Sequence, residues 1–157
     1  MILAVPLMAD STQEVKTVPL DPIIDFQNAF KDLESAWAQG DIHRISRYID
    51  PNTRIVFATM PAGPKMYSPT HLKALLKTKF SQCHNRMFRF VKFRNIEVPN
   101  SAPYGVARCK CLDNNSPAAQ EEIIYVSLRV NGRHPVIESI KTQTLSATQP
   151  PALLPHN

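Results

Sequence analysis

The side chains of this sequence that could exchange a proton with a substrate are few. The first of them is Glu138, which sits in the apolar run from Val136 to Ile140, and strict alternation puts it on one face with those two residues. A carboxyl group among apolar side chains has a raised pKa and can act as an acid or a base. We therefore take Glu138 as the candidate catalytic residue. The alternatives are that this face points outward, or that a neighbouring strand supplies a basic partner for the carboxylate.

Other polar residues could line a binding pocket beside Glu138. They are Tyr48, Asp50, His71, Arg108 and Lys110. Structural roles compete for two of them. Asp50 precedes Pro51 and is suited to a turn, and His71 falls in the first turn of an expected helix, where it would be exposed.

The cysteines do not form a recognisable metal or disulfide pattern. There are three, Cys83, Cys109 and Cys111. An odd number without regular spacing argues against a disulfide framework and for a reducing compartment. No second Cys or His pair has the spacing of a zinc site. We expect three buried thiols that pack as small apolar side chains, with no metal and no cofactor.

Positive charge is concentrated in the middle of the chain. The net charge is +5, and the segment from Lys65 to Arg94 holds eight basic residues and no acidic one. Such a segment suggests an anionic partner, which could be a nucleic acid such as RNA, an acidic protein or an anionic ligand, or else a solvated surface. The residues proposed for partner or RNA binding are Lys73, Lys77, Lys79, Arg86, Arg89 and Lys92. Phenylalanines lie between these basic residues, and their rings would either pack in the core or stack on the bases of RNA.

The first element that must position these groups is a helix over residues 21–39. Asp21 is suited to the N-cap and Pro22 to the first helical position. Apolar residues then recur at helical spacing, and Gly40 is placed to end the helix. The stripe consists of Phe26, Phe30, Leu33 and Trp37. It requires a covering surface.

The rest of the chain predicts a short helix, a strand, a third helix and four strands in succession. Asp41 can cap the short helix, residues 53–60 are β-branched and aromatic, and Ser68-Pro69 starts the third helix. The later strands cover residues 87–98, 104–112, 122–130 and 136–144, and Asn131-Gly132 marks a hairpin. This order predicts an α+β domain with an antiparallel sheet covered by helices on one face.

The length of 157 residues fits one domain. We expect an irregular arm at 1–20, a folded domain at 21–144 and a disordered Pro-rich tail at 145–157. No segment has the ~20 apolar residues of a membrane helix, so we expect no membrane contact and a cytoplasmic or nuclear location.

This order of elements resembles the nuclear transport factor 2-like superfamily, also called cystatin-like or ketosteroid-isomerase-like. The most specific matches are the stretches 36–41 (AWAQGD), 47–50 (RYID) and the final Asn131-Gly132 hairpin. The resemblance implies a bent sheet that forms a cone around the first helix, and dimerisation through the sheet as a homodimer or heterodimer. The side chains expected to line an apolar cone pocket are Phe30, Trp37, Tyr48, Asp50, Arg108, Val126 and Leu128.

The AWAQGD stretch looks most like the SnoaL-like polyketide cyclase branch, which implies isomerase, cyclase or dehydratase chemistry on a small apolar ligand. The catalytic positions of that branch do not match. The expected His and Asp of the last strand fall at Ser139 and Lys141. The second Asp of the ketosteroid-isomerase pattern falls at Val126.

A second branch offers an alternative function. The segment 49–61 resembles the small fungal-type cofactors of messenger-RNA export, which use this fold without catalysis and pair with a related domain. The missing catalytic residues and the basic segment agree with that interpretation, whereas AWAQGD does not.

Overall fold

The computed structural model describes residues 24–98, 101–113 and 119–145. The helices are α1 (Phe26–Gln39), α2 (Ile42–Ser46) and α3 (Pro69–Ser81), and the strands are β1 (Ile55–Met60), β2 (Gly63–Tyr67), β3 (Cys83–Arg94), β4 (Tyr104–Asp113), β5 (Ala119–Asn131) and β6 (His134–Leu145). The expected α+β architecture is confirmed. The expected arm and tail lie outside the described residues, except that Leu145 ends β6.

All six strands form one curved sheet in the order β2-β1-β6-β5-β4-β3. Its neighbouring strands are antiparallel except β1 and β6, which are parallel. The prediction of a fully antiparallel sheet is therefore corrected to a mixed one. A parallel pair needs a long crossover between its strands, and here the whole segment from β2 to β5 provides it.

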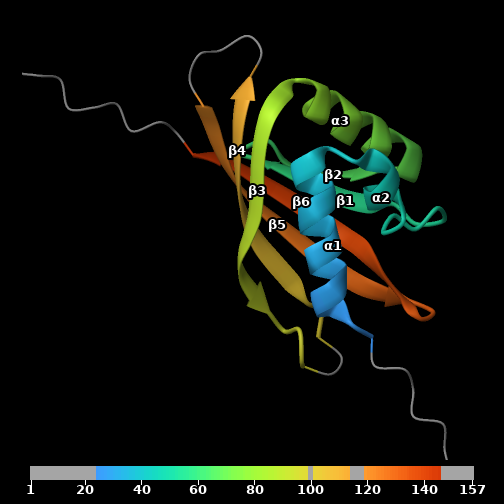
Figure 1. Cartoon of the computed structure of the whole chain (residues 1–157). Coiled ribbons are helices and arrows are strands. Elements are labelled where there is room, and N and C mark those ends of the chain that lie inside the picture. The colour runs from blue at the N-terminus through green and yellow to red at the C-terminus, as the bar shows by residue number, and fades with distance from the viewer. Residues whose placement is uncertain (1–23, 99–100, 114–118, 146–157) are drawn as a thin grey trace, which may run out of the picture.

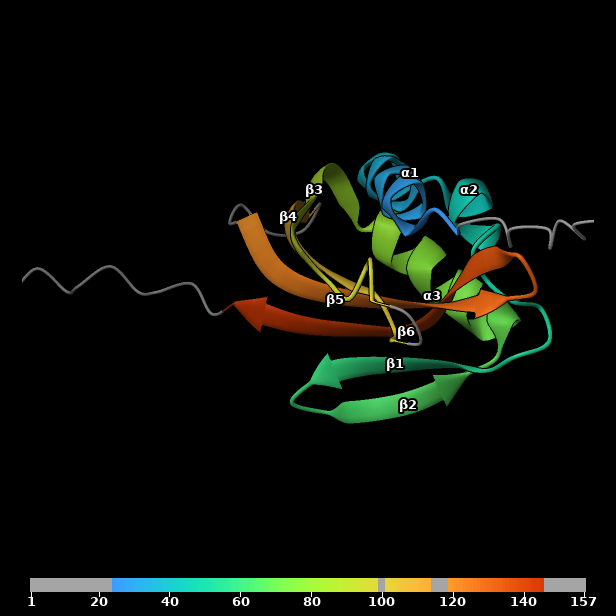
Figure 2. The same ribbon diagram turned by 90° about the horizontal axis from the view of Figure 1, so that it is seen from below.

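The three helices lie on the concave side of this sheet, and the convex side has no described helix over it (Figures 1 and 2). α1 crosses the concave side and packs against the edge strand β3. No described helix is both long and apolar enough to span a membrane.

α1 begins later than the sequence predicts. Its N-cap is Asp25, whose carboxylate accepts a hydrogen bond from the amide of Asn28 at 2.9 Å, and Asp21 lies outside the described residues. Gly40 ends the helix in the left-handed conformation with φ of 66°, as predicted. The buried stripe of Phe30, Leu33 and Trp37 is also confirmed.

The strand boundaries differ from the prediction at several places, and β2 and β3 differ most. The predicted order has no strand between residues 53–60 and the third helix, but Gly63 turns the chain with φ of 87° and β2 follows. Pro64 is tolerated because β2 is an edge strand, and an edge strand needs backbone hydrogen bonds to a neighbouring strand on one side only. β3 begins at Cys83 instead of residue 87 and ends at Arg94 instead of residue 98.

Candidate functional site

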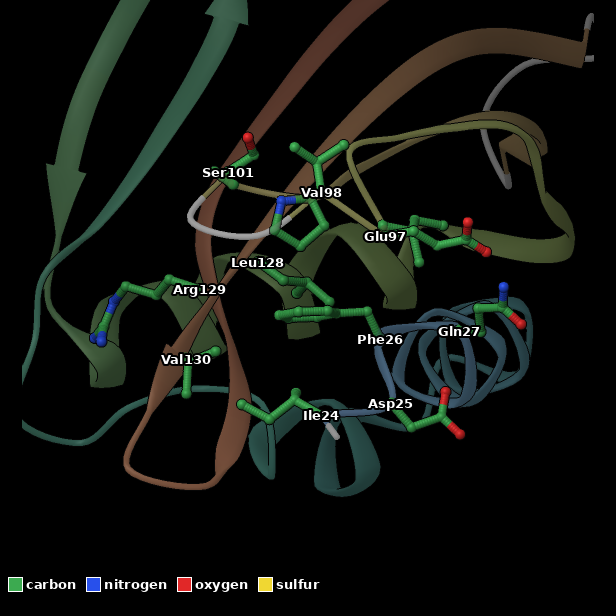
Figure 3. Close-up of a pocket in the computed structure, with 13 residues that line it drawn as sticks. Ile24, Asp25, Phe26, Gln27, Glu97, Val98, Ser101, Leu128, Arg129 and Val130 are labelled. Atoms are coloured by element: carbon green, nitrogen blue, oxygen red, sulfur yellow. The ribbon is translucent and has the colours of Figure 1, made fainter. Parts of the chain in front are cut away.

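A large hollow lies at the N-terminal end of α1 (Figure 3). It has a volume of about 880 Å³, which is in the range of small-molecule pockets. Three segments form it, namely the start of α1, the connection between β3 and β4, and the end of β5. The lining residues are Ile24, Asp25, Phe26, Gln27, Ile96, Glu97, Val98, Ser101, Ala102, Pro103, Leu128, Arg129 and Val130.

The floor of this hollow is apolar. The ring of Phe26 extends from α1 toward Leu128 on β5, and Val98 and Val130 face the space from two other segments (Figure 3). Val98 is 52% exposed and Val130 is 40% exposed. Large apolar side chains left this accessible at the rim of a concave surface are typical of a ligand-binding site.

The charged groups of the hollow are mainly acidic. Asp25 and Glu97 are exposed at its rim. Arg129, the described basic residue of the lining, is turned away, and its guanidinium lies 2.7 Å from the carboxylate of Asp50 (Figure 3). The hollow therefore presents carboxylates without a free cation among its described lining residues.

The interior of the cone is packed with side chains. Four of the residues predicted to line a pocket there, Phe30, Trp37, Val126 and Leu128, are each at most 1% exposed and belong to the core. The Trp37 ring stacks on Phe88 with centroids 5.0 Å apart. Leu128 alone among these four also contacts the large hollow, while Trp37 contacts a smaller cavity at the other end of α1.

Tyr48 and Asp50 hold elements together. The hydroxyl of Tyr48 donates to Asp32 on α1 at 2.8 Å, and burial with this bond raises the pKa of Tyr48 to about 12. Asp50 is buried in the loop before β1. Its carboxylate accepts hydrogen bonds from Thr53 at 2.8 Å and from Asn131 at 3.0 Å, besides the Arg129 pair. Both residues thus lie outside the large hollow.

The structure places Glu138 on the convex face of the sheet. Ser127 pairs with Ser139 and Leu128 pairs with Ile137, so Glu138 is the extra residue of a β-bulge. The bulge breaks the alternation on which the prediction depended, and the Glu138 carboxylate is exposed beside Ser127 at 3.5 Å. The expectation of a carboxyl in apolar surroundings is therefore wrong.

Arg108, the remaining predicted pocket residue, also lies on the convex face. It is exposed and pairs with Glu121 on β5, with Nε donating to Oε1 at 2.9 Å. Lys110 follows two residues later on the same face and is exposed. His71 is exposed near the start of α3, as the alternative interpretation expected.

A small cavity of about 70 Å³ lies at the other end of α1. Cys83 and Cys111 on its wall form a disulfide with 5.6 Å between their Cα atoms, which overturns the expectation of three free thiols. Strand pairing brings β3 and β4 together at this point, a relationship that cysteine spacing alone does not show. Cys109 remains a buried thiol, and burial raises its pKa to about 11.

The same cavity contains polar groups. Lys79 and Glu122 form an ion pair with Nζ and Oε2 2.7 Å apart, and the indole nitrogen of buried Trp37 has no hydrogen-bond partner among the described groups. The space is large enough to hold water and is much smaller than the hollow at the other end of α1.

The predicted basic residues do not form one surface. Lys73 and Lys77 lie on α3, whereas Arg89 and Lys92 lie on the convex side of β3. Lys79 is paired with Glu122. Arg86 donates to the carbonyl oxygens of Trp37, Phe80 and Cys83, and its guanidinium lies 4.4 Å from the Phe80 ring centroid. Arg86 therefore has a structural role.

Sequence reasoning missed the residues of the large hollow other than Leu128. Glu97, Val98 and Ser101 lie in the connection after β3, and Asp25 and Gln27 open α1. Two signals were available, namely an apolar pair, Ile96 and Val98, beyond the end of the strand and an acidic N-cap. Neither signal reveals that β5 lies between these segments.

Comparison with solved structures identifies the fold. A candidate dehydratase of the nuclear transport factor 2-like family from Streptomyces avermitilis aligns with a TM-score of 0.61 and 10% identity over 80% of this chain and 96% of its own. The chain has the nuclear transport factor 2-like fold. A second match is a candidate scytalone dehydratase from Novosphingobium aromaticivorans, with a TM-score of 0.61 and 6% identity over 77% of this chain and 82% of its own.

A third similar structure was solved with a small molecule. It is a protein with a ketosteroid isomerase-like fold from Catenulispora acidiphila in complex with trimethylamine, with a TM-score of 0.55 and 12% identity over 72% of this chain and 82% of its own. No protein family model matches the sequence, and no curated protein matches it. At such low sequence identities, what this chain shares with these solved structures is the nuclear transport factor 2-like fold.

Proposed function

We propose that this chain binds a small, largely apolar molecule carrying a positively charged end in the hollow at the N-terminal end of α1. The observation that supports this most directly is the hollow itself, with its volume of about 880 Å³ and its apolar floor around Phe26 and Leu128. An apolar ligand would bury its body against that floor.

The negative charges at the rim of the hollow are the reason for proposing a ligand with a cationic end. Asp25 and Glu97 are exposed there, and Arg129 is held by Asp50. A ligand cation would gain from both carboxylates without competing with a neighbouring guanidinium. The trimethylamine complex of the Catenulispora acidiphila protein agrees with a small amine as the ligand class.

Isomerase, cyclase or dehydratase chemistry would use the same hollow. Among its described lining residues, Asp25 and Glu97 are the carboxyl groups, which is the side-chain type that could serve as acid or base in such a reaction. Both are exposed, and Asp25 already caps α1. Ligand binding is therefore the function that the described geometry supports best.

A pair of fluorescent probes tests the proposal. Dansylcadaverine carries an ammonium group, and dansylglycine carries a carboxylate on the same apolar ring system. The difference between their affinities for the protein therefore measures the effect of the ligand's charge. We expect the cationic probe to bind more tightly, with an emission increase and shift to the blue on burial. Val98→Trp would fill part of the hollow and should weaken both probes.

Charge variants sharpen the test. Asp25→Asn keeps a side chain able to cap α1, and Glu97→Gln keeps the size of Glu97. Each variant should bind the cationic probe about two- to fivefold more weakly, as expected for exposed ion pairs, and should bind the anionic probe at least as tightly as the wild-type protein does. Glu138→Gln on the convex face is the matched control and should change neither. Equal binding of both probes by all variants would contradict the proposal.

A further inference from the structure

The convex face of the sheet is a second surface, on the opposite side from the helices (Figure 2). Strand register defines which residues occupy it. Lys92, Val106, Tyr125 and Lys141 follow one another across β3, β4, β5 and β6 in a single row. Arg94, Tyr104 and Ser127 form the next row.

This face is strongly basic. Its exposed cations are Arg89, Lys92, Arg94, Arg108, Lys110 and Lys141. The described carboxylates of the face are Glu121 and Glu138, and Glu121 is paired with Arg108. Lys110 also lies opposite Glu121 in the strand register, whereas Arg89, Lys92 and Arg94 on β3 lie opposite Arg108, Val106 and Tyr104, none of which is acidic. Two copies meeting through this face would bring these like charges together, so an anionic partner suits it better.

Two aromatic rings lie among these cations. Tyr104 and Tyr125 are half-buried on neighbouring strands, and the Lys141 ammonium lies 5.6 Å from the Tyr125 ring centroid. Rings on a sheet surface flanked by lysine and arginine provide stacking for bases and counter-charges for phosphates. An acidic protein face would use the cations but would have no need of alternation between rings and charges.

We propose that the convex face binds single-stranded nucleic acid, with bases stacked on Tyr104 and Tyr125 and phosphates held by Lys92, Arg94 and Lys141. The site lies on the opposite side of the sheet from the large hollow and is independent of the ligand-binding proposal. The contacts involve the backbone and base faces, so binding is expected to have little sequence preference.

Fluorescence anisotropy with a labelled single-stranded RNA of about 12 nucleotides, of mixed sequence, tests this. If the three cations each neutralise one phosphate, the affinity for the RNA should fall about 20-fold between about 50 and 200 mM salt. The double variant Lys92→Glu/Lys141→Glu should weaken binding more than tenfold. Tyr125→Leu should weaken it about five- to a hundredfold while leaving the salt dependence unchanged, because stacking is lost but the cations remain.

The matched control is Lys73→Glu/Lys77→Glu on α3, which makes the same charge change on the other side of the sheet (Figure 2). It should leave the affinity within about twofold, since each lysine would lie beyond a Debye length from the bound strand. Circular dichroism confirms that each variant is folded. Three outcomes would overturn the proposal: an equal loss in the control, no effect of Tyr125→Leu together with equal binding of polyglutamate, or a self-association that buries this face and excludes the RNA.

Discussion

The carboxylate of Glu34 on α1 accepts a hydrogen bond from the backbone amide of Phe90 on β3 at 2.7 Å. The register of β3 against β4 shifts between Phe90 and Lys92 at the same place, which marks a bulge. β3 is an edge strand, so its outward amides have no neighbouring strand to pair with. Glu34 thus fixes α1 to the sheet and occupies part of an edge that could pair with another chain.

Replacing Glu34 tests this contact. Glu34→Ala leaves the Phe90 amide without its acceptor and should lower the free energy of unfolding by about 1–2 kcal/mol. Glu34→Gln keeps an acceptor oxygen and should lose less. Urea unfolding followed by circular dichroism measures both, with exposed Lys31→Ala on the same helix as the control. An alanine variant as stable as the control would show that the bond contributes nothing.

Residue 105 must be a glycine because two aromatic rings, those of Phe90 and Phe30, pack directly against its backbone. A Cβ atom placed there would lie 2.7 Å from the Phe90 ring and 3.2 Å from the Phe30 ring. The two rings are themselves packed edge to face with centroids 5.2 Å apart, so neither can move freely. Gly105→Ala should therefore destabilise the protein by about 1–3 kcal/mol, as overpacking does.

A double-mutant cycle isolates this effect. Phe90→Leu makes room beside residue 105 and should reduce the cost of Gly105→Ala when the two changes are combined. Thermal unfolding of the four proteins gives the interaction free energy. Additive changes would mean that Gly105 is needed for its backbone and not for space.

The Cys83–Cys111 disulfide closes a loop with a sequence separation of 28 residues, and Cys109 remains a buried thiol. Thiol labelling in denaturant should modify one cysteine before reduction and all three afterwards. Cys83→Ser should lower the free energy of unfolding by about 2–4 kcal/mol, and Cys109→Ser serves as the comparison without a crosslink. Labelling of all three cysteines without reductant would contradict the disulfide.

How far the sequence predicts this molecule depends on whether a feature is local. The apolar stripe of α1, its glycine end at Gly40 and the capped start of α3 all follow from spacing within a few residues, and the structure confirms them. β2 was not predicted because of its proline, since only the place of β2 at the sheet edge makes Pro64 acceptable.

The candidate site was much less predictable. The face of Glu138 depends on a bulge opposite Ser127, and the hollow depends on β5 meeting α1 and the β3–β4 connection. These relationships join residues far apart in the chain. Alternation assigns faces correctly only in strands without register shifts, which is why Val126 was placed in the interior correctly and Glu138 was not.

Asp50 joins the loop before β1 to the β5–β6 hairpin and should make stability depend on pH. The amide of Asn52 donates to its carboxylate at 2.9 Å, and this bond, followed by those from Arg129 and Thr53, lowers the pKa of Asp50. The unfolded chain has a carboxyl pKa of about 3.9. A lowered folded-state pKa stabilises the protein fully above that unfolded value, and the contribution is lost as the pH falls through the folded value.

Asp50→Asn should therefore lower the melting temperature at neutral pH by several degrees, because an amide cannot accept all four hydrogen bonds and brings no charge to Arg129. Below about pH 4 the wild-type protein loses the same contribution, so the two melting temperatures should converge. Asp41→Asn is the matched control, since Asn also caps a helix and should change little. Melting curves between about pH 2 and 7 measure the difference. A gap between Asp50→Asn and wild type that stays constant over this range would show that the charge of Asp50 is not what stabilises the fold.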